Sequence, residues 1–148
     1  MANGRDDRRQ LFCRVIAPEG IIYDGEADLV VARIADGDLG VMVDHEPLVS
    51  SVEIGEVRIK EGEERRVFAT SDGFFKVSEN LVQVLVEEAV EAGDIDVDEA
   101  GRRVEEAEKQ FGEVSEDDND ADRQREDIER RRRMGENLSR VARKYGNG

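Results

Sequence analysis

The side chains best suited to bind a metal ion or move a proton are concentrated in one short stretch, residues 36–48. They are Asp36, Asp38, Asp44, His45 and Glu46. Carboxylate and imidazole groups are common ligands for divalent cations. Their spacing matches no familiar ligand pattern, however, and strand alternation would point them in different directions. The stretch therefore favours a polar loop over a metal centre, and we predict no metal site.

Nucleophilic catalysis and phosphate binding also lack a recognisable motif. His45 is the only histidine, and no serine or cysteine lies beside it to form a nucleophile–base pair. No glycine-rich loop followed by lysine is present. Cys13 is the single cysteine, which excludes an intrachain disulfide, and it alternates with Arg14 in an apolar segment as a buried strand residue would. We predict no catalytic residue and no cofactor.

The backbone of residues 36–48 is constrained by glycine and proline. Gly37 and Gly40 suit a tight loop, and Val41–Val43 forms a short apolar run that predicts a buried strand. Pro47 fixes its own φ angle and favours an extended Glu46. We therefore expect a shaped polar loop on a β scaffold.

The scaffold is predicted from short apolar segments separated by turn residues. Many short strands at such spacing indicate a sandwich or barrel of β-strands. In the last segment, Val82, Val84 and Val86 share one face, while Leu81 and Leu85 share the other. A strand that is apolar on both faces is expected to be buried on both. Either a protein partner or another element of this chain would then cover the outer face.

Strand alternation ends at Ala89, and helical periodicity follows a connector at residues 92–95. Asp96, with Glu99 three residues later, forms a capping box before apolar residues at helical spacing, and Gly112 is expected to end that helix. A second helix is predicted from about Arg123 to Tyr145. Its apolar stripe is thin and Gly135 weakens it, so we expect it to depend on docking for its order.

These patterns predict an α+β protein: an N-terminal antiparallel β-sandwich followed by a C-terminal two-helix hairpin. The expected boundaries are a disordered tail at residues 1–10, the sandwich at 11–92, and the hairpin at 93–148. An acidic linker at residues 113–122 would join the two helices.

Charge is distributed unevenly along the 148 residues, whose net charge is −15. Residues 1–112 carry −14 and residues 113–122 carry −6, whereas residues 123–144 carry +5 and include Arg130, Arg131, Arg132 and Arg133. The acidic total argues against nucleic acid as a partner. The basic tail suggests contact with an acidic surface, although a solvated charged helix fits the same pattern.

The polar N-terminus indicates no signal peptide, and no apolar run approaches the roughly 20 residues needed to span a bilayer. We therefore expect a cytoplasmic protein that meets a membrane only through another protein.

Three ordered motifs together resemble one family. They are VIAPEG at residues 15–20, GDLGVMVDHEPL at residues 37–48, and GFFKV at residues 73–77, followed by the helix opening Ile95-Asp96. In order and spacing, residues 11–111 resemble the epsilon subunit of F-type ATP synthases, which is called delta in mitochondria. The second helix matches only in position and character.

The resemblance implies a non-catalytic rotor subunit in the central stalk of a proton-translocating synthase. Such subunits bind the gamma subunit and the membrane c ring, and lie at the cytoplasmic face of the cell membrane. Their C-terminal helices can extend to the alpha/beta catalytic head and inhibit ATP hydrolysis. Carried over, the resemblance assigns c-ring contacts to Asp38, Asp44, His45 and Glu46, and a regulatory role to Arg130–Arg133.

The sequence departs from the family pattern at three turn or helix positions. Val43 replaces the usual proline, and Asp72-Gly73 replaces a glycine pair. Glu99 stands where members that bind ATP between their helices carry arginine, so we expect weak or absent ATP binding. Two other functions remain open at this point: a stand-alone β-sandwich binding module with a mobile helical tail, and a small nucleotide sensor.

Overall fold

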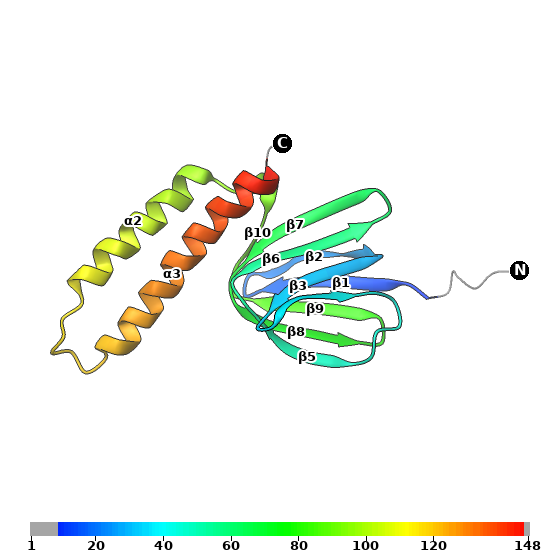
Figure 1. Cartoon of the computed structure of the whole chain (residues 1–148), viewed down its shortest axis with the longest axis horizontal. Coiled ribbons are helices and arrows are strands. Elements are labelled where there is room, and N and C mark those ends of the chain that lie inside the picture. Colours follow the sequence, from blue (N-terminus) through cyan, green and yellow to red (C-terminus); the bar gives the residue numbers. More distant parts are fainter. Residues whose placement is uncertain (1–8, 147–148) are drawn as a thin grey trace, which may run out of the picture. The chain divides into compact units, whose positions relative to one another are not determined.

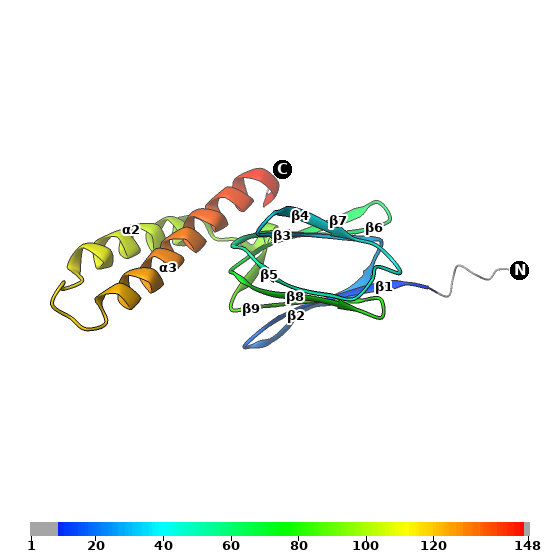
Figure 2. The ribbon, with the colours of Figure 1, turned by 60° about the horizontal axis from the view of Figure 1, so that its bottom comes forward.

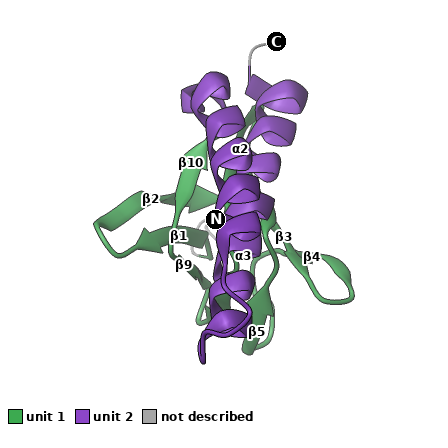
Figure 3. Cartoon of the chain, turned by 90° about the vertical axis from the view of Figure 1, so that its left-hand side faces the viewer, with its two compact units in different colours: residues 1–91 green, residues 92–148 purple. Residues whose placement is uncertain are grey.

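The computed structural model describes residues 9–146, so most of the predicted N-terminal tail lies outside the described residues. The chain divides into two compact units between Glu91 and Ala92, one residue before the expected boundary (Figure 3). The first unit is built from strands and the second from helices (Figure 1). The predicted order of sandwich and helical hairpin is confirmed.

Ten strands within residues 11–91 form two five-stranded sheets, which lie as two layers in Figure 2. The first sheet, in the order β2-β1-β9-β8-β5, and the second, β10-β7-β6-β3-β4, are called sheet 1 and sheet 2. The strands are β1 (Leu11–Ala17), β2 (Gly20–Ala27), β3 (Leu29–Ile34), β4 (Gly37–Val41), β5 (Leu48–Val52), β6 (Gly55–Glu61), β7 (Glu64–Thr70), β8 (Gly73–Ser78), β9 (Leu81–Val86) and β10 (Ala89–Glu91).

The core lies between the two sheets, where alternate residues of each strand meet. Phe75 and Val84 of sheet 1 and Phe68 and Val57 of sheet 2 are at most 2% exposed. Burial of such apolar side chains supplies most of the driving force for folding. Strand pairing is antiparallel as predicted, with one exception: β1 and β9 run parallel, because they are joined through the rest of the sandwich rather than by a hairpin.

This chain buries β9 on one face only, so within the described residues no other element covers its outer face. Val82, Val84 and Val86 face the core, but on the outer face Leu81 is half-buried and Leu85 is 41% exposed. The sequence left open whether another element of this chain or a partner protein covers this face. Because the face is exposed in the chain alone, cover by a partner protein is favoured.

Residues 36–48 are a strand between two turns rather than one loop. β4 covers Gly37–Val41 and pairs with β3, and Val41 is fully buried. The predicted strand at Val41–Val43 was therefore shifted, because Met42 and Val43 are 58% and 41% exposed and lie in the following turn.

The helical unit contains α2 (Val97–Glu113) and α3 (Ala121–Val141), with a 3₁₀ turn η1 (Ala92–Asp94) before them and a π-helical turn η2 (Ala142–Gly146) after them. The Asp96 carboxylate accepts a hydrogen bond from Glu99 N at 3.1 Å, so the predicted cap is confirmed. Gly112 was wrongly expected to end α2, which continues to Glu113. Helix α3 begins two residues before the predicted start.

Gly135 packs closely against α2 rather than being only a weak point in α3. A Cβ atom at this position would lie 2.9 Å from the Val104 side chain and 3.2 Å from the Ala100 carbonyl oxygen. Only glycine fits between the α3 backbone at this position and the atoms of α2. Close packing of the two helices therefore compensates for the low helix propensity of glycine.

Candidate functional site

The four residues predicted to contact the c ring lie in two groups at opposite ends of β4. Asp38 is near the start of the strand, whereas Asp44, His45 and Glu46 follow its end. The strand from Asp38 to Val41 already spans about 10 Å, and Asp44 lies farther along the chain. The structure therefore separates Asp38 from the other three residues along β4, and their contact with a c ring stays a prediction.

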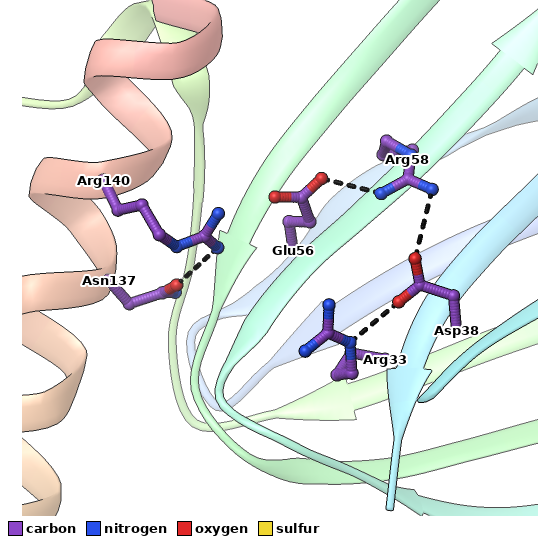
Figure 4. Close-up of polar contacts among 6 residues, drawn as sticks. All are labelled: Arg33, Asp38, Glu56, Arg58, Asn137 and Arg140. Atoms are coloured by element: carbon purple, nitrogen blue, oxygen red, sulfur yellow. Dashed lines mark hydrogen bonds and ion pairs between the residues drawn. The ribbon is translucent and has the colours of Figure 1, made fainter. Parts of the chain in front are cut away.

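Asp38 is the centre of a chain of ion pairs on the outer face of sheet 2 (Figure 4). Arg33 Nε donates a hydrogen bond to one carboxylate oxygen at 2.8 Å, and Arg58 reaches the other at 3.5 Å. Arg58 also donates to Glu56 at 2.7 Å. The hydrogen bond from Arg33 lowers the pKa of Asp38 below its ordinary value, helped by the positive charge of Arg58. Asp38 is thus ionised and internally paired.

At the other end of β4, residues 42–45 form a tight turn in which His45 N donates to the Met42 carbonyl at 3.2 Å. Asp44 occupies the third position with φ of 66°, a left-handed conformation that is uncommon outside glycine. Asn80 binds this turn: Asp44 N donates to Asn80 Oδ1 at 2.6 Å. Arg9 forms an ion pair with the Asp44 carboxylate. These contacts hold the turn in place against the β8–β9 connection.

His45 has a backbone contact rather than a catalytic partner. Its Nδ1 atom lies 2.7 Å from the Glu46 carbonyl oxygen. Within residues 9–146, no cluster of three histidine, cysteine or acidic side chains has the arrangement of a metal site. Burial raises the pKa of Cys13 to about 12, because the thiolate would lose hydration inside the sandwich.

An exposed apolar surface on sheet 1 was only partly anticipated from the sequence. We define the apolar face as the outward side chains of β1, β9, β8 and β5. Phe12, Phe74, Leu85 and Val49 are 43%, 62%, 41% and 69% exposed. The strand register places Phe74 opposite Leu85, and Lys76 opposite both Val49 and Gln83. Alternation in β9 indicated such a face and left open whether a partner or this chain covers it, but the contributions of Phe12, Phe74 and Val49 were not anticipated.

One cation within the apolar face lacks a complete set of hydrogen-bond partners. Arg14 of β1 lies opposite Gln83 in the register and forms an ion pair with Asp24 at 3.5 Å. Its Nε atom is buried but makes no hydrogen bond within the described residues. A partner that offers a carboxylate or carbonyl oxygen here would satisfy that donor.

The four consecutive arginines of α3 are mostly paired within their own helix. Arg130 and Arg131 both approach Asp127, and Arg132 pairs with Glu129 and, at 2.7 Å, with Glu136. The hydrogen bond to Glu129 raises the pKa of Arg132. Arg133 is exposed and has no such carboxylate partner among the described residues. The tail therefore presents less free positive charge than its sequence suggests.

Exposed apolar side chains on a rigid sheet, flanked by ordered ion pairs, are the features of a protein that binds other proteins. Residues 10–92 match the family model described as ATP synthase, Delta/Epsilon chain, beta-sandwich domain. An ATP synthase epsilon chain from Rubrobacter xylanophilus is 64% identical over 141 residues, which cover 95% of this chain and 97% of that relative. One from Ligilactobacillus salivarius is 35% identical and covers 86% of this chain and 92% of the relative.

A solved structure has the same fold: a chain of the Euglena gracilis mitochondrial ATP synthase, with a TM-score of 0.70 and 22% identity, covering 89% of this chain and 81% of that chain. The chain belongs to the ATP synthase delta/epsilon family. The prediction of a non-catalytic stalk subunit is thereby confirmed. No helix within the described residues is long and apolar enough to cross a membrane.

Proposed function

We propose that the protein joins the gamma subunit to the c ring in the central stalk of a proton-translocating F-type ATP synthase. It would act at the cytoplasmic face of the cell membrane, as a peripheral subunit. The observation that carries the proposal is the 64% identity to an epsilon chain across nearly its full length. The exposed apolar surface on a stiff sandwich supports it, because a part that transmits torque needs a rigid body and a large contact area.

The apolar face is the proposed gamma-binding surface. Phe74, Leu85 and Phe12 supply apolar area from three adjacent strands. Arg14 and Lys76 lie in the row between them and give the centre of the face a positive charge on an otherwise acidic unit. A partner surface with apolar side chains around one or two carboxylates would complement both features.

The two ends of β4 are proposed to meet different partners. Asp38 belongs to an ion-paired, polar corner that suits the polar loops of a c ring. Asp44, His45 and Glu46 adjoin exposed Met42 and Val43, and the Asn80 carbonyl, beside this turn, accepts a hydrogen bond from Phe12 N at 2.8 Å. This end continues into the apolar face, so we assign it to the gamma side rather than to the ring.

The assignment of the two ends can be tested in the assembled synthase. We expect Asp38→Ala to weaken the coupling of proton transport to ATP hydrolysis while leaving gamma affinity within about twofold. His45→Ala is expected to do the reverse, lowering gamma affinity without uncoupling. Equal uncoupling by both substitutions would support the original assignment of all four residues to the ring.

The helical unit is proposed to regulate ATP hydrolysis by contacting the alpha/beta head. Because Arg130, Arg131 and Arg132 already have carboxylate partners within α3, Arg133 is the arginine of this run most available to an acidic partner. Deleting residues 113–148 should raise the ATPase rate of the head with gamma, and Arg133→Ala should reproduce part of that rise. An unchanged rate after the deletion would remove the regulatory role.

The proposed function is tested directly by co-expression with the gamma subunit of the same organism. We expect the two chains to co-purify and to elute together in size-exclusion chromatography. A stand-alone binding module with a helical tail would elute by itself, and that result would favour the alternative function.

A further inference from the structure

Sheet edges expose unpaired backbone groups, and most edges of this sandwich carry features that prevent another strand from pairing. β2 has the charged residues Asp24 and Glu26, and β10 is only three residues long. β4 contains the ion-paired Asp38 and two glycines. Charge, short length and glycine are the usual means by which proteins protect an edge.

β5 is the edge that lacks this protection. Its sequence, Leu48-Val49-Ser50-Ser51-Val52, has no charged residue, glycine or proline. It pairs with β8 alone, and within residues 9–146 no other strand forms a ladder with it. Val49, the most exposed of the large apolar side chains, lies on this strand at 69%.

The free edge is continuous with the apolar face. Ser51 lies opposite Phe74 in the register, and Val49 lies opposite Lys76. A strand added beside β5 would therefore place alternate side chains next to Val49 and Ser51, at the border of the surface assigned to gamma. One partner could cover the face and pair with the edge at the same time.

We propose that β5 accepts an extended segment of the gamma subunit, which extends sheet 1 by one strand. The inference rests on the proposed function, because it names the way in which the same partner binds. The segment that fits carries both an apolar residue, which would cover Val49, and an acidic residue in reach of Lys76 on the same face, at every second position of the added strand. Backbone hydrogen bonds would fix the orientation of sheet 1 relative to gamma.

A second copy of this chain is a poorer occupant of the edge. Two chains of net charge −15 repel one another. A five-residue strand paired with its copy would also bury far less than the roughly 1,200 Å² that stable interfaces usually bury. Gamma would add the area of the apolar face to the strand pairing.

Amide hydrogen exchange of the full chain, free and bound to gamma, tests the proposal. We expect alternate amides of Leu48–Val52, those whose N–H groups face away from β8, to exchange at least tenfold more slowly in the complex. If gamma binds and these amides do not change, the strand addition is wrong and the proposed function stands. If gamma does not bind, both are wrong. Concentration-dependent protection in the free chain would show self-pairing and overturn the proposal.

A charge on the edge provides a second test, independent of exchange. Val49→Glu should weaken gamma binding at least tenfold, because the carboxylate would repel the acidic side chains of the incoming segment at its border with β5. Val97→Glu is the matched control, since Val97 is 51% exposed but lies in the helical unit. Equal affinities of the two variants would contradict the proposal, and circular dichroism of each would establish that both remain folded.

Discussion

The Asn80 side chain binds the left-handed backbone of Asp44 across 36 positions of sequence. Asp44 N donates to the Asn80 side-chain oxygen at 2.6 Å, and Asn80 Nδ2 donates back to an Asp44 carboxylate oxygen at 3.3 Å. Both residues have positive φ angles, 66° and 63°. The pair connects the turn that follows β4 of sheet 2 to the turn between β8 and β9 of sheet 1.

This relationship predicts a conditional effect on stability. Asn80→Ala should lower the free energy of unfolding by about 1–2 kcal/mol, because it leaves the strained Asp44 turn without its hydrogen bond. In an Asp44→Gly background the same change should cost less, since glycine adopts the positive φ without support. Urea denaturation of the four proteins of this cycle measures the coupling. Additive losses would show that the two residues act independently.

Two glycines in the helical unit should respond to alanine in opposite directions. Gly135→Ala should lower the melting temperature despite the higher helix propensity of alanine, because its Cβ would lie 2.9 Å from Val104. Gly101→Ala is the control: a Cβ there meets nothing within 4 Å, so a gain of roughly 0.5–1 kcal/mol is expected. Differential scanning calorimetry compares them. Stabilisation by both changes would refute the close packing at Gly135.

The stability contributed by Asp38 should disappear in acid. Its pKa is lowered in the folded state by the hydrogen bond from Arg33, so folding favours the charged form. The contribution is present above the unfolded-state pKa of about 3.9 and is lost as the pH falls through the lower folded-state value. Because the pair is largely exposed, the effect should be below about 1 kcal/mol.

Asp38→Asn should therefore be less stable than the unchanged protein at pH 7, with the difference shrinking towards pH 2. Melting temperatures across that range measure the difference. A difference that stays constant from pH 7 to pH 2 would mean that ionisation of Asp38 does not matter.

Cys13 should be unreactive in the folded protein. Its side chain is fully buried, and its raised pKa of about 12 leaves almost no thiolate at pH 8. Alkylation by iodoacetamide at pH 8 should be negligible in buffer and complete in 6 M guanidinium chloride, as measured by mass spectrometry. Rapid labelling in buffer would show that the sandwich opens around β1.

Much of the fold could be predicted from local patterns, because alternation in β9 and the capping residue Asp96 act over a few positions. The role of Gly135 could not, since a glycine in a helix looks unfavourable until the neighbouring helix is placed beside it. The same limit applies to the candidate site. Asp38 and Asp44 are close in sequence, but Asp38 lies near the start of extended β4 and Asp44 lies beyond its end.

The arginines of α3 show why charge counting misleads. In sequence, Arg130–Arg133 form a strongly basic run, yet helical geometry places Asp127, Glu129 and Glu136 three or four positions from three of them. The resulting pairs add only a small stabilisation to the helix, and the dependence of α3 on docking stays a prediction, since its apolar residues are buried.

The central claim, that this protein binds the stalk through the apolar face of sheet 1, is tested most directly by calorimetric titration into the purified alpha/beta head with gamma. The account predicts one chain bound per complex, and a loss of affinity of at least tenfold for Phe74→Asp. Phe111→Asp, which alters a 43% exposed phenylalanine of α2, should bind within about twofold of the unchanged protein. Unchanged binding by Phe74→Asp, or no binding by the unaltered chain, would contradict the account.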